Sequence, residues 1–169
     1  MPLRTLNALL GHFGLEADLL KLTPDESQHL REAIAFYKSG RSWHEGASVQ
    51  VLDHDESGLL ATSLVAADGS RGWVTVVSTT SQAEAIAAPL RLQGLEREAH
   101  YRVRVHPLWP AQPQLSKRPA GPFTGDIDLI LAGQALLQAG LALPVMQPGT
   151  GVLLCLQRLQ ATAGLLVSP

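Results

Sequence analysis

Several features that mark common classes of protein are missing from this sequence. It has one cysteine, Cys155, in 169 residues, so no disulfide can form within the chain, and a reducing compartment is expected. Charged residues make up 17% and the net charge is −2, which gives no electrostatic reason to expect nucleic acid or an anionic membrane as partner. No apolar run approaches the roughly 18 residues of a membrane span, and no signal peptide is recognisable. We therefore expect a cytoplasmic globular protein.

The motifs of common enzyme classes are lacking as well. Neither kind of glycine-rich phosphate loop nor a G-x-S-x-G nucleophile elbow is present, and H-E-G at 44–46 lacks the second histidine of a zinc helix. Cys155 lies in an apolar, strand-like run, where a buried and inert thiol is expected. The sequence thus predicts no catalytic residue, no bound metal and no cofactor.

Two polar groupings leave alternatives open. The segment LDHDESG at 52–58 could hold a cation, but its place between two predicted strands favours a solvated hairpin loop. Asp126 and Asp128 would project to the same face of a strand. Two carboxylates about 5–10 Å apart could serve glycoside hydrolysis, although ordinary exposed charges at the start of a strand are favoured.

The tryptophans offer a weak indication of carbohydrate binding. There are three, Trp43, Trp73 and Trp109, and exposed indoles could stack on a sugar ring. Trp73 and Trp109 are the candidates for sugar contact. The favoured alternative is that the three rings fill a core or a domain boundary.

What is present begins with an amphipathic helix. In T-P-D-E, Thr23 can cap the helix, Pro24 suits its first turn, and Glu26 completes a capping box. The spacing predicts a helix from Thr23 to Lys38, ended by Gly40. Before Thr23 we expect a short helical turn and a loop.

The predicted helix carries one apolar stripe that includes Leu30, Ile34 and Tyr37. A helix of this length is marginal in water unless such a stripe is buried. A β-sandwich closes its core between its own two sheets, so the stripe needs another partner. Leu30, Ile34 and Tyr37 are therefore the candidate interface residues, toward a second copy or another domain.

From about residue 46 the apolar period changes from helical to two, as in strands. Asp68-Gly69 is a common hairpin turn, and 133–140 could form one helical turn. The class predicted is mainly β, an antiparallel β-sandwich preceded by a short helical segment, with boundaries 1–44 and 45–169. The candidate strands are 48–52, 59–66, 72–77, 88–92, 101–106, 127–131 and 151–157.

Several motifs together resemble one family of enzymes. They are LGHFGLEADLLKLTPDE, LREAIAFYKSGR and HEG in the helical part, then LDHD, YRVRV and LAGQALLQAGLALPV in the β part. Their order and spacing resemble the C-terminal region of bacterial α-galactosidases of glycoside hydrolase family 36. The helical part is similar to the end of that family's catalytic barrel, and the remainder is similar to its C-terminal β-domain.

The resemblance implies an enzyme several times larger, with its nucleophile and acid/base aspartates in barrel motifs of the K-W-D and S-G-G-x-R types. Neither motif occurs here, so no catalytic residue carries over. The expected role is a non-catalytic C-terminal structural domain. The alternatives are an interaction or oligomerisation domain, or a carbohydrate-binding module with weak affinity for galactosides. The expected protein partner is a second copy or the catalytic barrel.

Overall fold

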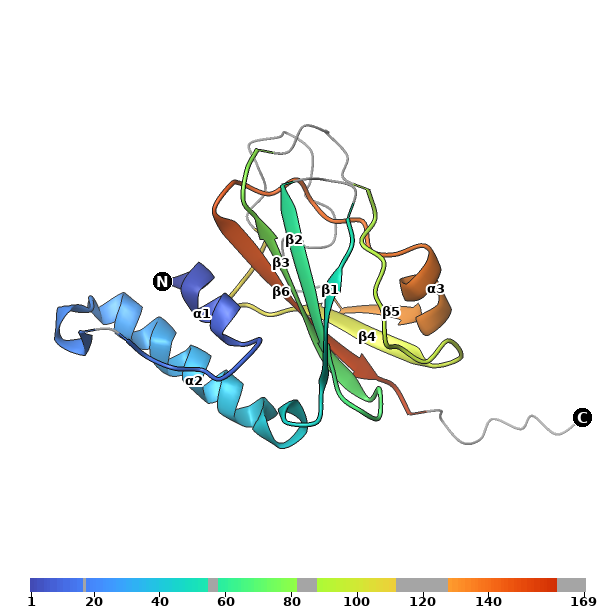
Figure 1. Ribbon diagram of the computed structural model, residues 1–169, viewed down its shortest axis with the longest axis horizontal. Coiled ribbons are helices and arrows are strands. Elements are labelled where there is room, and N and C mark those ends of the chain that lie inside the picture. The colour runs from blue at the N-terminus through green and yellow to red at the C-terminus, as the bar shows by residue number, and fades with distance from the viewer. Residues whose placement is uncertain (17, 55–57, 82–87, 112–127, 161–169) are drawn as a thin grey trace, which may run out of the picture.

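The protein consists of helices at its N-terminal end and a twisted antiparallel sheet after them (Figure 1). The computed structural model describes residues 1–16, 18–54, 58–81, 88–111 and 128–160. The helical part comprises α1 (Pro2–Ala8), the 3-10 turn η1 (Leu19–Lys21) and α2 (Pro24–His44). The rest comprises β1 (Ser48–Leu52), β2 (Leu59–Val65), β3 (Arg71–Ser78), β4 (His100–Val105), β5 (Asp128–Ala132), α3 (Gly133–Gln138) and β6 (Thr150–Arg158).

The six strands form one sheet in the order β1-β2-β3-β6-β4-β5, and every neighbouring pair is antiparallel. The long central strands β3 and β6 pair from Arg71–Gln157 to Ser78–Thr150. The predicted mainly β, antiparallel class with a leading helical segment is confirmed. The predicted two-sheet sandwich differs from this arrangement, because all strands among the described residues belong to the same sheet.

Helices and connecting segments, instead of a second sheet, cover the two faces of this sheet. Each face has its own apolar core. One face packs against α3 and the segments around it, through Leu90, Leu92, Leu95, Leu136, Leu141, Leu143 and Met146. The opposite face packs against α1 and α2. The buried residues of this second cluster, which we call the helix–sheet seam, are Leu6, Leu9, Ala33, Tyr37, Leu64, Trp73, Trp109 and Leu153. Burial of apolar surface on both faces stabilises the sheet without a second one.

The start of α2 is as predicted, and its end is not. The Thr23 hydroxyl accepts a hydrogen bond from the Glu26 N–H at 3.2 Å, and the Thr23 N–H donates to the Glu26 carboxylate at 3.1 Å. The helix then continues through Gly40 to His44. Gly40 is retained inside the helix for packing, since a Cβ there would lie 2.5 Å from two ring carbons of Trp73.

One predicted strand is not formed. Within the described part of 88–92, only Leu90 makes a β-bridge, to Leu141. The Leu92 N–H bonds instead to the carbonyl of Leu136 in α3. This segment lies on the face of the sheet that packs against α3. Its alternating leucines are buried in the apolar core of that face.

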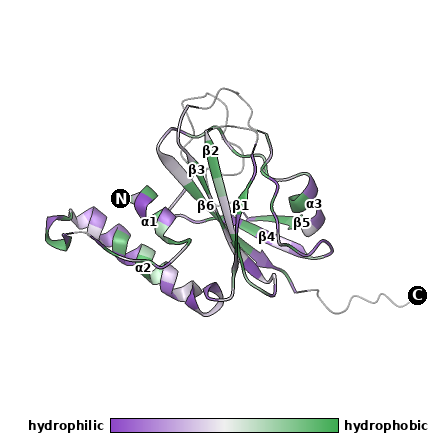
Figure 2. Cartoon of the chain, in the orientation of Figure 1, coloured by the Kyte–Doolittle hydropathy of each residue, from purple (hydrophilic) through white to green (hydrophobic). Residues whose placement is uncertain are grey.

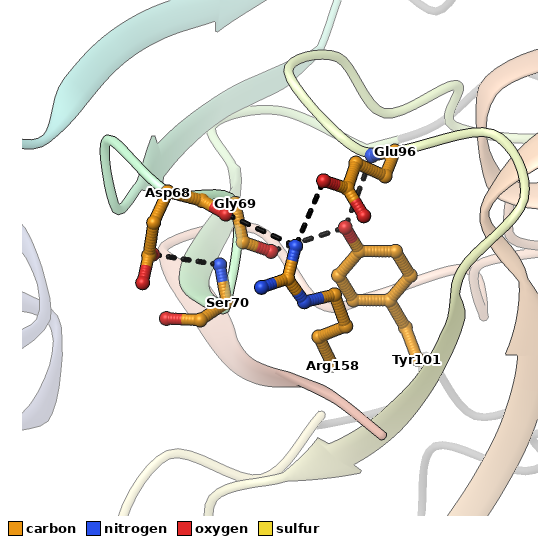
Figure 3. Close-up of polar contacts among 6 residues, drawn as sticks. All are labelled: Asp68, Gly69, Ser70, Glu96, Tyr101 and Arg158. Carbon is orange, nitrogen blue, oxygen red and sulfur yellow. Dashed lines mark hydrogen bonds and ion pairs between the residues drawn. The ribbon is translucent and has the colours of Figure 1, made fainter. Parts of the chain in front are cut away.

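The predicted Asp68-Gly69 turn is confirmed and firmly anchored. Gly69 has a φ of 63°, a conformation that favours glycine. Figure 3 shows how distant parts of the chain meet at this turn. The Tyr101 hydroxyl donates to the Gly69 carbonyl and accepts from the Glu96 N–H, both at 3.0 Å. Arg158 Nη1 lies 3.2 Å from the Asp68 carbonyl and 2.9 Å from the Glu96 carboxylate.

The distribution of apolar residues agrees with the packing of helices on both faces of the sheet. In Figure 2 the strands are predominantly apolar in colour, whereas α2 alternates between polar and apolar patches along its length. Across the described residues, no helix combines the length and the apolar character that a bilayer span requires.

Candidate functional site

The apolar stripe of α2 is covered by the chain itself. Leu30 and Tyr37 are buried, and Ile34 is half-buried. Tyr37 belongs to the helix–sheet seam, where its ring lies 5.5 Å from that of Phe13 and 5.4 Å from that of His44. Leu30 and Tyr37, two of the candidate interface residues, are therefore covered within the chain in this structure. For Tyr37 the covering surface is the helix–sheet seam.

The two candidate sugar-contact residues are core residues. Trp109 is 1% exposed, and its Nε1 donates to the Pro2 carbonyl at 3.0 Å and to the Thr5 hydroxyl at 3.1 Å. Trp73 is 6% exposed and stacks on Phe36 with ring centroids 4.6 Å apart. Neither indole presents a free face for stacking on a sugar, so the favoured alternative of a core role is the one observed.

Two histidines, His29 and His106, pack against Trp109 of the helix–sheet seam. The sequence did not predict a role for them. His29 Nε2 lies 2.7 Å from the Thr5 hydroxyl oxygen. His106 Nδ1 accepts from the Leu108 N–H at 3.2 Å, and its ring packs 4.2 Å from that of Phe36. Burial lowers the pKa of both histidines. Thr5 lies 24 residues from His29, and Phe36, the ring partner of His106, lies on α2, so only the folded chain reveals these two contacts.

Asp128, one of the two carboxylates that the sequence suggested as a pair, lies beside two arginines. Asp128 lies 2.7 Å from Arg104 Nη2 and 2.9 Å from Arg102 Nε. The hydrogen bond from Arg104 is the main cause that lowers the pKa of Asp128. This carboxylate thus accepts a hydrogen bond from Arg104 and forms an ion pair with Arg102, and its suggested partner Asp126 lies outside the described residues.

Nor does a nucleophile or a metal site emerge from the described residues. Burial raises the pKa of the Cys155 thiol to about 12, which removes its thiolate at neutral pH. In the LDHDESG segment, His54 Nε2 bonds to the Ala88 carbonyl at 2.7 Å, while 55–57 lie outside the description. No group of three or more His, Cys, Asp or Glu side chains is placed to hold a metal ion within the part described.

A strongly exposed apolar feature stands at the start of α2. Leu19 and Leu20 of η1, which we call the leucine tip, are 55% and 97% exposed. The turn is fixed by Asp18, whose carboxylate accepts from the Leu20 N–H at 3.1 Å and pairs with Lys21 at 3.3 Å. Figure 1 shows this turn at the end of α2 that is farthest from the sheet. The chain thus holds two leucines outward in a defined turn.

Sequence comparison identifies relatives of this chain. A model described as the glycosyl hydrolase family 36 C-terminal domain matches residues 59–162. α-Galactosidase AgaA from Geobacillus stearothermophilus is 34% identical over 97 residues, which are 57% of this chain and 13% of that protein. An α-galactosidase from Escherichia coli is 28% identical over 161 residues, which are 92% of this chain and 22% of that protein.

Solved structures agree with the sequence relatives. A variant of AgaA in complex with raffinose superposes with a TM-score of 0.70 at 26% identity, covering 92% of this chain and 19% of that one. The α-galactosidase from Lactobacillus brevis shares the fold with a TM-score of 0.72 at 16% identity, covering 95% and 20%. The chain therefore spans about a fifth of the length of these enzymes. It belongs to glycoside hydrolase family 36 and corresponds to that family's C-terminal domain.

Proposed function

We propose that this chain is a non-catalytic structural domain that supports the catalytic barrel of a family 36 α-galactosidase. The observation that carries the proposal is the helix–sheet seam. Residues 1–44, which resemble the end of the barrel, are fixed to the sheet by Leu6, Leu9 and Ala33 packing on Trp73 and Leu153. A segment continuous with a barrel would thereby be held at a defined place on the β-domain.

The leucine tip supplies the contact surface in this proposal. Leu20 is 97% exposed, and burying a leucine side chain is worth about 1.5–3 kcal/mol. Relatives are about five times longer than this chain, since it covers 19–22% of them. We assign the tip to the remainder of such an enzyme, because four-fifths of that length has no counterpart here.

The lack of catalysis is tested by direct assay. The purified chain is incubated with p-nitrophenyl α-galactoside beside the E. coli relative as positive control. We expect no release of nitrophenol above the blank. Turnover that copurifies with the 18.1 kDa chain through two chromatographic steps would contradict the proposal.

The supporting role is tested in a chimera that carries this chain in place of the matching 22% of the E. coli enzyme. We expect soluble, active enzyme, and loss of solubility or activity when Leu20→Asp is introduced at the tip. Ala35→Asp, an exposed apolar-to-acidic change on α2, is the matched control and should be tolerated. An inactive parent chimera, or equal effects of the two substitutions, would count against the assignment.

Self-association through the same tip is the second candidate. The tip is apolar and exposed in the single chain, so a second copy could cover it. Light scattering should then show dimers that Leu20→Asp converts to monomers; a monomer at high concentration removes this candidate. A cytoplasmic location is proposed from the single cysteine, and fractionation of the source cells tests it.

A further inference from the structure

A cationic hollow lies beside the helix–sheet seam, between the C-terminal half of α2 and the sheet. It encloses about 320 Å³, at the lower end of the range of ligand pockets. Strands β3, β6 and β4 form its floor. The residues that line it are Phe36, Ser39, Gly40, Trp43, Arg71, Trp73, Arg102, Arg104, Cys155, Leu156 and Gln157. We call this set the cationic hollow.

Strand register places the arginines on either side of the floor. Arg71 of β3 pairs with Gln157 of β6, which in turn pairs with Arg102 of β4. Paired residues on adjacent strands point to the same face, and strands lie about 4.8 Å apart. The backbones of Arg71 and Arg102 are thus separated by about 10 Å, with the polar Gln157 between them. A small group resting over Gln157 would be flanked by two guanidinium groups.

The hollow carries an excess of positive charge. Asp128 pairs with both Arg102 and Arg104, at 2.9 and 2.7 Å, and so neutralises one of their two charges while fixing their positions. Arg71 is exposed and makes no side-chain ion pair or hydrogen bond within the described residues. Three guanidinium groups and one carboxylate leave a net charge of +2 around this floor.

Two tryptophans, Trp43 and Trp73, form an aromatic wall of the hollow beside the arginines. Trp43 is half-buried and meets Trp73 edge to face, with ring centroids 4.9 Å apart. Trp73 is itself held between Gly40 and Phe36. Trp73 thus fixes the position of Trp43, and the exposed part of Trp43 can contact the apolar side of a small organic molecule whose charged end faces the arginines.

We propose that the cationic hollow binds a small organic oxyanion, a phosphate ester or a carboxylate on a sugar-sized body. Guanidinium groups recognise both oxyanions through paired, charge-assisted hydrogen bonds. The anionic group lies between Arg71 and Arg102, and the body lies along Trp43. The site belongs to the β-domain and its seam, so it does not depend on the proposed role toward a barrel.

Calorimetric titration of the full chain at low salt tests this site. The probes are inorganic phosphate, galactose 6-phosphate, glucuronate and neutral galactose. We expect saturable binding of at least one organic anion, with no binding of galactose. Binding of only the phosphorylated sugar or only glucuronate identifies the oxyanion; no saturation by either below about 10 mM overturns the proposal.

Two exposed arginines provide a matched pair of variants. Arg71→Ala should weaken binding about 10–150-fold, the equivalent of the 1.5–3 kcal/mol of a charged hydrogen bond. Arg97→Ala makes the same change of charge outside the hollow and should leave affinity within about twofold. Equal losses in both variants would show a general charge effect and would contradict a built site. Circular dichroism confirms that each variant is folded.

Discussion

Gly40 of α2 lies against the indole of Trp73 in β3, so closely that a Cβ at position 40 would stand 2.5 Å from two of the ring's carbons. This contact lets the helix axis approach the sheet at the centre of the helix–sheet seam. It also explains why a glycine is kept inside a helix, where it is unfavourable by about 0.5–1 kcal/mol relative to alanine.

Gly40→Ala should therefore destabilise the protein although it favours the helix. Overpacking costs about 1–3 kcal/mol, and the gain in helix propensity offsets about 1 kcal/mol of it. We expect a net loss of up to about 2 kcal/mol in the free energy of unfolding, measured by urea denaturation. Gly46→Ala is the control, since a Cβ there meets nothing within 4 Å; equal stability of the two variants would disprove the packing argument.

Tyr101→Phe tests the anchored turn. The hydroxyl is buried, donates to the Gly69 carbonyl and accepts from the Glu96 N–H. Its removal leaves two backbone groups without their partner, at a cost of about 1–3 kcal/mol. Tyr37→Phe removes a hydroxyl for which no hydrogen bond is seen among the described residues and should change stability by less than about 0.5 kcal/mol. If Tyr101→Phe left the free energy of unfolding unchanged, water would have to satisfy the two backbone groups in place of the hydroxyl.

The two histidines beside the seam should make stability depend on pH. Burial lowers the pKa of His29 and His106 below the unfolded value of 6.5. The unfolded chain then binds more protons than the folded chain as pH falls through 6.5, so acid favours unfolding. We expect the melting temperature to fall by a few degrees between pH 7.5 and 5.

Replacing both histidines should flatten that dependence. His29→Gln with His106→Gln removes the two groups whose protonation opposes burial, while the lowered pKa values of Asp68 and Asp128 act at lower pH. The exposed His12→Gln is the control and should retain the slope. An unchanged slope in the double variant would show that other groups control stability in this range.

Local sequence signals were sufficient where structure depends on neighbours in the chain. The capping box of Thr23 and Glu26 and the turn at Gly69 are set by residues within three positions. A local signal gave the wrong helix end at Gly40, because glycine is favoured both after the last turn of a helix and where a helix packs closely on another element. Only the second requirement applies here, and it comes from Trp73, 33 residues later.

The layers and the candidate sites depended on long-range pairing. The stripe of α2 indicated that a partner was needed, but the sequence could not show that the partner was the chain's own sheet. The cationic hollow is likewise formed by register, which brings Arg71, Gln157 and Arg102 into one row. Their separation in sequence hides that row until the strand order is known.

Cys155 should react slowly with thiol reagents in the native protein. It lies in β6 opposite Trp73, and burial raises the pKa of its thiol to about 12. At pH 8 only about one thiol in ten thousand is then ionised, and the thiolate is the reactive form. We expect dithionitrobenzoate to label the native chain very slowly and the urea-unfolded chain within minutes. Gly40→Ala should speed native labelling, because loosening of the seam reduces the burial that raises the pKa of the thiol. Cys155 is partly exposed and lines the cationic hollow, so rapid labelling of the native chain would show that its thiolate is populated near pH 8, and the raised pKa would then have to be abandoned.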